Sequence, residues 1–181
     1  MILSDRELVE MLREPRTRRE GFAVLVKQYS EKLYWKVRRI VLSHEDANDV
    51  LQNVFIKVWS NLQNFQGKSS LSTWLYRIAI NESLDFLRKQ KLADKVSADE
   101  DVSVASRLMS DEYFDGDEVQ ARLQEAVARL PEVQRTVFNL KYFEEMKYSE
   151  MSQILNTSEG ALKASYHLAV KKITEYLHLF D

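Results

Sequence analysis

The side chains of this sequence that are best suited to chemistry are cations arranged for contact with a polyanion. Lys163, His167 and Lys171 recur at every fourth residue, and this spacing places all three on one face of a helix. A second basic group occupies residues 88–91, at the end of a long apolar repeat. Lysine and arginine bind phosphate oxygens strongly and with little regard to sequence, so both groups indicate binding to nucleic acid.

A short polar segment around Phe65 offers hydrogen-bonding groups of another kind. Its amides and hydroxyls both donate and accept hydrogen bonds, and its one lysine adds a charge. Glycine at position 67 favours a loop here rather than a helix. The side chains concerned are Asn64, Gln66, Lys68, Ser69 and Ser70.

Side-chain sets that catalyse reactions or hold metals are missing from the sequence. The chain has no Cys, so thiolate catalysis and Cys-ligated zinc are excluded. His44, His167 and His178 are dispersed, with no His-x-x-x-His pair, and four glycines form no phosphate-binding loop. We therefore expect no enzyme activity, no catalytic residue, no metal, no cofactor and no small-molecule substrate.

The elements that must position the N-terminal groups are predicted to be helices. Ser4 and Glu7 form a capping-box pattern, and an apolar repeat over residues 22–41 predicts a long helix. Ser43 is expected to cap the next helix, and Ser72 is expected to cap a third one that ends in the basic group. The apolar stripe of the middle helix comprises Ala47, Val50, Leu51, Val54, Phe55, Val58, Trp59 and Leu62.

The C-terminal elements fit a helix-turn-helix. A short helix from Ser149, a turn with a left-handed Asn156 and a last helix capped by Ser158 follow one another. This geometry places a second helix in a DNA major groove. Upstream, Asp117 is expected to cap a helix through Leu130, and Pro131 suits the first turn of the next. The expected core faces comprise Val133, Val137 and Leu140, then Leu162, Tyr166, Ala169, Ile173 and Leu177.

Composition and charge set the organisation of the chain. The 181 residues are 45% hydrophobic with a net charge of −2, so a basic surface has to be local. Acidic and serine residues dominate residues 96–117, which predicts a flexible acidic linker between domains at 1–95 and 118–181. No apolar run is long enough to cross a bilayer, and a charged N-terminal stretch does not resemble a signal peptide. We therefore expect an all-α cytoplasmic protein of two small helical domains.

Several motifs together resemble one known family. Residues 46–59, DANDVLQNVFIKVW, resemble region 2.2 of sigma-70-type factors. FQG at 65–67 and STWLYRIAIN at 72–81 resemble regions 2.3 and 2.4 of the extracytoplasmic-function (ECF) members. LP at 130–131, YSEM at 148–151 and SEGALK at 158–163 resemble region 4. The motifs keep the family's order and spacing, and a linker too short for a region 3 domain is what the ECF group implies.

The resemblance implies a set of partners. They are core RNA polymerase, promoter DNA with its −10 and −35 elements, and an inhibitory anti-sigma factor, which in this family is often anchored in the membrane. The function implied is promoter recognition, DNA melting and transcription initiation. Such a factor performs no chemistry itself, because the polymerase adds the nucleotides.

The resemblance also assigns residues to each partner. Asp49, Gln52 and Asn53 would contact the polymerase core. Loop 64–70 would capture a flipped base of the −10 element, with Tyr76, Arg77 and Asn81 near the open strand and Arg88, Lys89 and Lys91 on phosphates. The −35 element would face Lys163, Ala164, Ser165, His167, Leu168 and Lys171.

Two positions depart from the family pattern, and two rival functions stay open. Asn53 stands where the family usually has Glu, and residues 168–170 read Leu-Ala-Val where several Arg are common, so fewer bidentate base contacts are available. A stand-alone helix-turn-helix regulator would explain residues 117–181 but leave the polar loop without a reason. An all-helical adaptor that binds only proteins would need no basic residue for its function.

Overall fold

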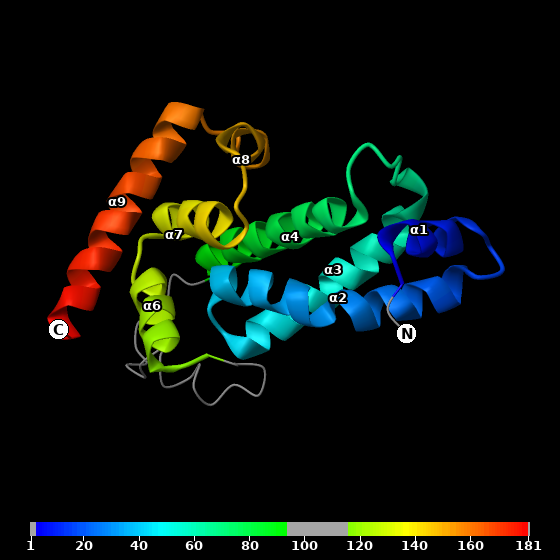
Figure 1. Cartoon of the computed structure of the whole chain (residues 1–181), viewed down its shortest axis with the longest axis horizontal. Coiled ribbons are helices and arrows are strands. Elements are labelled where there is room, and N and C mark those ends of the chain that lie inside the picture. The colour runs from blue at the N-terminus through cyan, green and yellow to red at the C-terminus, as the bar shows by residue number, and fades with distance from the viewer. Residues whose placement is uncertain (1–2, 94–115, 181) are drawn as a thin grey trace. The chain divides into compact units, whose positions relative to one another are not determined.

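The computed structural model describes residues 3–93 and 116–180, and every regular element in these two ranges is a helix (Figure 1). The chain separates into two compact units, one within residues 1–95 and the other within residues 96–181. The expected all-α fold of two helical units is therefore confirmed. The acidic linker lies outside the described residues except for Gly116 and Asp117, so its limits and flexibility stay predictions. In the described ranges, no helix is long and apolar enough to cross a membrane.

The first unit is built from three long helices and a short one. Helix α1 spans Asp5–Arg13, α2 spans Arg18–Val41, α3 spans His44–Asn61 and α4 spans Leu71–Ala93. Helices α2, α3 and α4 pack on one another, and α1 packs against α2. The core between them comprises Leu25, Leu33, Val37, Ile40, Val50, Val54, Leu71, Leu75 and Ile80, all of which are buried.

The predicted caps of this unit hold at two helices and fail at the third. Ser4 and Glu7 complete a capping box, and the Ser43 hydroxyl accepts from the Asp46 N–H. Helix α4 begins at Leu71, so the hydroxyl that accepts from its Thr73 N–H, at 3.2 Å, belongs to Ser70. The expectation that Ser72 caps this helix was wrong, because Ser72 lies within the first turn of α4 and a capping residue precedes the helix.

The α3 stripe is buried along its centre, whereas Leu51 and Phe55 on its flank are half-buried. Ala47, Val50, Val54, Val58 and Leu62 are buried, whereas Trp59 is 41% exposed. Trp59 lies one residue, about 100° of helix rotation, past Val58, which turns its ring away from the core. The ring packs edge-on against Phe22 of α2, with centroids 5.0 Å apart.

Helix α1 is fastened to α2 by a close approach and by hydrogen bonds. A Cβ added at Gly21 would lie 2.8 Å from the Met11 Cβ, so only glycine allows this helix spacing. The Gln28 side chain donates to the Leu3 carbonyl and accepts from the Leu3 N–H. The Tyr29 hydroxyl donates to the Asp5 carboxylate. These contacts fix α1 beside the loop that connects α3 to α4.

The second unit wraps short helices around the last one. Helix α6 spans Glu118–Ala128, α7 spans Glu132–Phe138, α8 spans Tyr148–Leu155 and α9 spans Glu159–Leu177, with a π-helical turn, η2, at Asn139–Phe143. Helix α9 packs against α6, α7 and α8. One buried cluster holds them together and comprises Ala126, Val127, Leu130, Phe138, Ala169 and Ile173.

In this unit the predicted caps and the left-handed turn are confirmed, whereas one predicted core position is wrong. Asp117 accepts from the Gln120 N–H, Ser158 accepts from the Ala161 N–H, and Asn156 has φ 50° and ψ 47°. Val133 was predicted to be buried but is 64% exposed. The buried residues of α7 run consecutively from Thr136 into the π turn, which leaves its first turn outside the core.

Two helix starts in this unit differ by one residue from the prediction, and α6 ends at Ala128 rather than at the predicted Leu130. Pro131 occupies the N-cap position of α7 rather than its first turn, and α8 begins at Tyr148 rather than at Ser149. At the other end of the pattern, Leu162, Ala169 and Ile173 of α9 are buried as predicted. The two remaining members of the α9 stripe, Tyr166 and Leu177, are partly buried and pack on the cluster.

Candidate nucleic-acid interface

The outer face of α3 is exposed, and its charges are the Asp49 carboxylate and, further along, Lys57, which pairs with Glu82. Asp49, Gln52 and Asn53 are all exposed, and Ile56, which continues their row, is 58% exposed. At the start of the helix, burial raises the pKa of Asp46 and the neighbouring Asp49 raises it further. This face therefore combines amide hydrogen-bonding groups, an acidic end and exposed apolar area at Ile56, one turn before the partly exposed Trp59.

The polar loop follows α3 directly. A 3₁₀ turn at Leu62–Asn64 ends the helix, and Gly67 takes a φ of 69°, a left-handed conformation that glycine adopts without strain. Asn64, Gln66 and Lys68 are exposed, whereas Ser69 is half-buried. The Ser70 hydroxyl is already engaged in capping α4 and lies 3.0 Å from the Ser72 hydroxyl. The loop thus presents its exposed amides and Lys68 to solvent more freely than Ser70.

Helix α4 continues the candidate surface. Tyr76 and Arg77 are half-buried and Asn81 is exposed. Near the end of the helix, Arg88 pairs with Asp85 at 2.7 Å, while Lys89 is exposed. Lys91 is exposed as well. Because the Arg88–Asp85 pair is largely exposed to water, it contributes little to stability and can exchange Asp85 for a phosphate.

A basic row on α2, which the sequence reasoning missed, lies beside α4. Lys32, Lys36 and Arg39 follow one another at intervals of four and three residues, so they share a helix face. The Lys36 ammonium lies 4.0 Å from the centre of the Tyr76 ring on α4. Burial, and then the charges of Arg39 and Lys32, lower the pKa of Lys36 to about 8. The spacing of these three basic residues indicates a shared helix face, but they lie within residues 22–41, where the apolar repeat is the stronger pattern.

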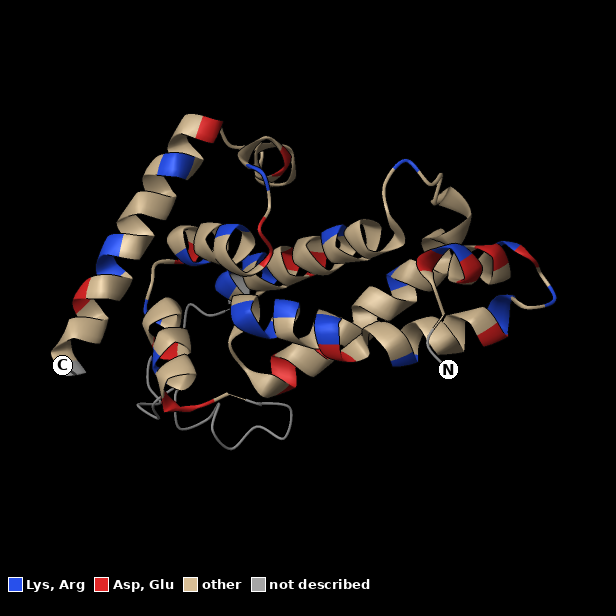
Figure 2. Ribbon diagram, viewed as in Figure 1, with Lys and Arg blue, Asp and Glu red and all other residues tan. Residues whose placement is uncertain are grey.

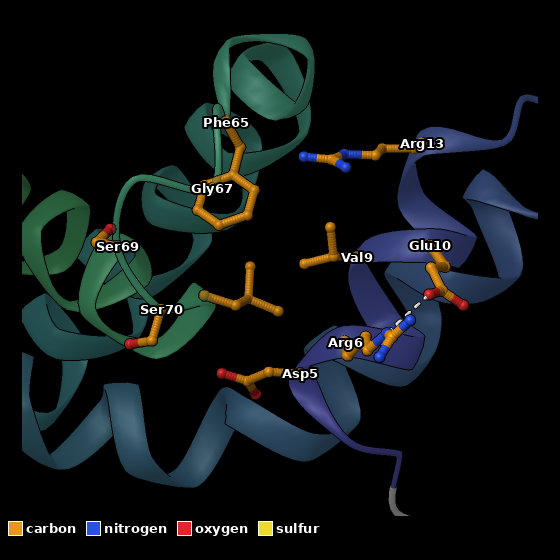
Figure 3. A pocket seen from close by; sticks show the side chains of 10 residues that line it. Asp5, Arg6, Val9, Glu10, Arg13, Phe65, Gly67, Ser69 and Ser70 are labelled. Atoms are coloured by element: carbon orange, nitrogen blue, oxygen red, sulfur yellow. Dashed lines mark hydrogen bonds and ion pairs between the residues drawn. The ribbon is translucent and has the colours of Figure 1, made fainter.

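A cavity of about 320 Å³ opens between α1 and the polar loop (Figure 3). It is lined by Asp5, Arg6, Val9, Glu10 and Arg13 of α1 and by Phe65, Gly67, Ser69, Ser70 and Leu71. The sequence reasoning assigned no role to α1, because only folding brings residues sixty positions apart into one cavity.

In the second unit, α9 exposes the basic row that the spacing predicted. Lys163, His167 and Lys171 are exposed, and Figure 2 shows basic bands along α9 between acidic ones. The Lys163 ammonium lies 5.6 Å from the centre of the Tyr148 ring on α8, and Lys171 is 3.9 Å from Glu175. Ala164 and Leu168 are exposed on the same side, Leu168 by 46%, and Ser165 is half-buried. Small and basic side chains on an exposed face suit close approach to a DNA groove.

Comparison with known proteins decides the family. Residues 25–93 match sigma-70 region 2, and residues 120–173 match sigma-70 region 4, which together cover more than half of the chain. The ECF RNA polymerase sigma factor SigW of Bacillus subtilis is 32% identical over 157 residues, covering 82% of this chain and 84% of SigW. The chain belongs to the ECF group of the sigma-70 family. Two further relatives extend across nearly the whole of this sigma factor.

The RNA polymerase sigma-H factor of Pseudomonas aeruginosa is 30% identical over 182 residues, covering 96% of this chain and 93% of that protein. The ECF RNA polymerase sigma-E factor of Escherichia coli K12 is 30% identical over 176 residues, covering 90% of this chain and 88% of that protein. Family membership establishes the broad activity of this sigma factor, which is promoter recognition and transcription initiation through RNA polymerase.

Solved structures share the fold of this sigma factor. The sigma factor RpoE of Bartonella quintana, solved in complex with the anti-sigma factor NepR, superposes with a TM-score of 0.69 at 20% identity, covering 88% of this chain and 98% of RpoE. CnrH, solved in complex with the cytosolic domain of CnrY, superposes with a TM-score of 0.63 at 22% identity, covering 98% of this chain and 99% of CnrH. At these identities the likeness supports the fold alone.

The predicted site residues of this sigma factor fall on three separate surfaces. The first unit carries the polymerase residues on α3 and the −10 residues on the loop and on α4, while the second unit carries the −35 residues on α9. Their individual contacts stay predictions. Among the described residues, no group of three His, Asp or Glu side chains is placed to hold a metal ion.

Proposed function

We propose that this sigma factor divides its task among three surfaces, one for each partner of the initiation complex. The first unit binds the polymerase core through α3 and the opened −10 strand through the polar loop and α4. The second unit binds the −35 element through α9. The single observation that best supports this division is that two separately folded units match two regions of one family, in order, on one chain.

The α3 face is proposed to dock on the polymerase core. Asp49 supplies a charge for a basic partner, Gln52 and Asn53 supply amide hydrogen bonds, and Ile56 supplies exposed apolar area. An exposed carboxylate steers encounter and selects the partner more than it adds affinity. The 58% exposure of Ile56 provides apolar surface that a partner can remove from water.

The loop and α4 are proposed to hold the −10 strand open. Extruding a base from a duplex costs a few kcal/mol, and hydrogen bonds from Asn64, Gln66 and Ser69 to the exposed base edge offset part of that cost selectively. The rim of this surface is basic, and Arg77, Lys89 and the α2 row are proposed to contact phosphates. The protein thus contributes binding energy to melting, and bond formation belongs to the polymerase.

Helix α9 is proposed to enter the major groove at the −35 element. Lys163 lies in its first turn and a half, the part of a recognition helix that contacts base edges. His167 and Lys171 follow along the same face. With Leu168 and Val170 exposed where guanidinium groups are common, the contacts here depend on fewer bidentate pairs and more on phosphates and apolar contact.

An inhibitory protein is proposed as a further partner. The sigma factor RpoE was solved in complex with the anti-sigma factor NepR, and CnrH was solved in complex with the cytosolic domain of CnrY. On this chain the exposed apolar side chains of α3, Ile56 and Trp59, give such a protein a surface that overlaps the polymerase-docking face. An anti-sigma factor covering it would exclude the polymerase.

Reconstituted transcription tests the proposal. Purified bacterial core polymerase is mixed with this protein and genomic promoter fragments, and the 5′ ends of the transcripts are mapped. We expect defined starts that share −10 and −35 elements and that require this protein. Absence of specific starts, together with no co-elution of protein and core in gel filtration, would refute the assignment.

Charge reversal on α3 tests the docking surface separately. Asp49→Lys is expected to weaken co-elution with the core, whereas Glu31→Lys, which reverses another exposed carboxylate, on α2, is expected to leave it intact. Equal loss in both variants would indicate a general electrostatic effect rather than docking through α3.

A further inference from the structure

The cavity beside the polar loop has two walls, and one of them lies outside the segment that matches the family. Helix α1 occupies Asp5–Arg13, whereas the region 2 match begins at residue 25. Five of the lining residues come from α1 and five from residues 65–71. The identified motifs therefore account for half of the cavity, and the role of the α1 half has to be inferred from its own chemistry.

The interior of the cavity combines apolar and aromatic surface. Val9 of α1 and Leu71 of α4 are apolar, and Phe65 directs its ring towards α1 (Figure 3). The Phe65 ring packs at a tilt against the Trp74 ring, with the two ring centres 5.1 Å apart. A volume of about 320 Å³ lies in the range of small-ligand pockets. An aromatic ring beside an apolar wall is the surface on which unpaired bases stack.

The charged groups of the cavity leave one cation without a partner. Arg6 pairs with Glu10 at 3.2 Å, and Asp5 accepts the Tyr29 hydroxyl. Within residues 3–93 and 116–180, the Arg13 guanidinium has no hydrogen bond or ion pair of its own. Its Nη2 atom lies 3.6 Å from the position that a Cβ on Gly67 would occupy, so the guanidinium reaches the loop backbone.

We propose that α1 forms the second wall of a pocket for one extruded nucleotide of the −10 strand, with Arg13 donating hydrogen bonds to the edge of its base. The inference rests on the proposed function and names the residue that completes the pocket. The base stacks on Phe65 against Val9, and its edge faces Arg13. Arg13 thereby reads the base as well as neutralising the strand, because a guanidinium fork can donate two parallel hydrogen bonds to one base.

The position of the glycine in the loop fits this arrangement. A side chain at position 67 would project towards the Arg13 guanidinium and occupy the space between the two walls. Gly67 therefore keeps the cavity open as well as allowing the left-handed turn, at φ 69°.

Scanning removal of bases tests the role of Arg13. The holoenzyme, formed from the full chain and core polymerase, is bound to a pre-opened promoter probe carrying one abasic site at a time through the −10 element. With the wild-type chain we expect one position at which loss of the base weakens binding about 5- to 100-fold. In Arg13→Ala the intact probe should bind more weakly, and the abasic penalty at that position should shrink to the part that stacking on Phe65 supplies. Arg13→Lys should restore part of the affinity but not the base dependence, because an ammonium lacks the planar fork.

Arg19→Ala is the matched control, because it removes an exposed arginine of the neighbouring helix that does not line the cavity. It should keep the position-dependent penalty. The proposal is overturned if Arg13→Ala retains the full penalty, or if it weakens every probe equally with a salt slope about one unit smaller, which marks a phosphate contact. If the wild-type holoenzyme neither binds the probe nor initiates transcription, the proposed function itself fails.

Discussion

The contact between Gly21 and Met11 makes a quantitative prediction about the placement of α1. In Gly21→Ala the new Cβ would lie 2.8 Å from the Met11 Cβ and 3.3 Å from the Met11 carbonyl carbon, whereas carbon atoms pack best at about 3.5–4.0 Å. The two helices must therefore separate by up to about 1 Å. Overpacking of this kind costs about 1–3 kcal/mol, and the better helix propensity of alanine offsets about 1 kcal/mol of it. We expect a net loss near 1 kcal/mol.

Urea unfolding, followed by tryptophan fluorescence, measures this loss of stability in the first structural unit. All three tryptophans, at positions 35, 59 and 74, lie in the first unit, so their emission reports its unfolding alone. With a slope of about 1–3 kcal/mol per molar urea, the midpoint should fall by roughly 0.5 M.

Gly160→Ala is the matched substitution on another helix. A Cβ at Gly160, in the first turn of α9, meets nothing within 4 Å, so the same change should be neutral or stabilise the second unit by up to about 1 kcal/mol. Far-UV circular dichroism would record it. A stabilised Gly21→Ala protein would refute the close α1–α2 contact and with it the fixed wall of the cavity.

Three further outcomes are expected. Asp117→Ala removes the side chain that accepts from the Gln120 N–H and should destabilise the second unit by about 1 kcal/mol, seen as a lower Tm by circular dichroism. The folded pKa of Lys36, about 8, lies below its usual 10.5, so the unfolded chain holds the extra proton and the free energy of unfolding should rise from pH 8 to 10. In Lys36→Met that rise should be smaller by urea unfolding, and equal slopes would contradict the burial of this amine. If Lys163 contacts a base, Lys163→Ala should reduce the preference for the correct base pair at one position of a −35 duplex by about 5- to 100-fold. If Lys163 contacts a phosphate, the variant should bind all duplex sequences more weakly by the same factor.

Local signals in the sequence account for much of the fold. Ser4, Ser43, Asp117 and Ser158 all cap helices as their positions predict, because a cap depends on a few neighbouring residues. The choice between Ser70 and Ser72 could not be made in this way, since both serines stand near the start of α4 and only the true first turn distinguishes them.

Packing and distance explain the remaining differences. Val133 has the right spacing for a core position, but the π turn after α7 shifts the buried face to later residues. The cavity between Arg13 and Gly67 joins two segments that share no periodicity, so no sequence pattern could indicate it. Lys36 was hidden for another reason, because its row runs beside an apolar stripe on the same helix.

Helix α2 also fixes the distance between two parts of the proposed DNA-binding surface. Its early turn, at Gly21, supports the wall of the nucleotide cavity, and its last turns carry Lys36 and Arg39. The eighteen helical steps from Gly21 to Arg39 correspond to about 27 Å, a length that the continuous helix keeps nearly constant. Under the proposed function, the rise of helix α2 therefore sets the distance between the extruded nucleotide and the phosphates that the basic row holds. Promoters used by this protein would have to match that length, and their tolerance for spacing changes within the −10 region should be small.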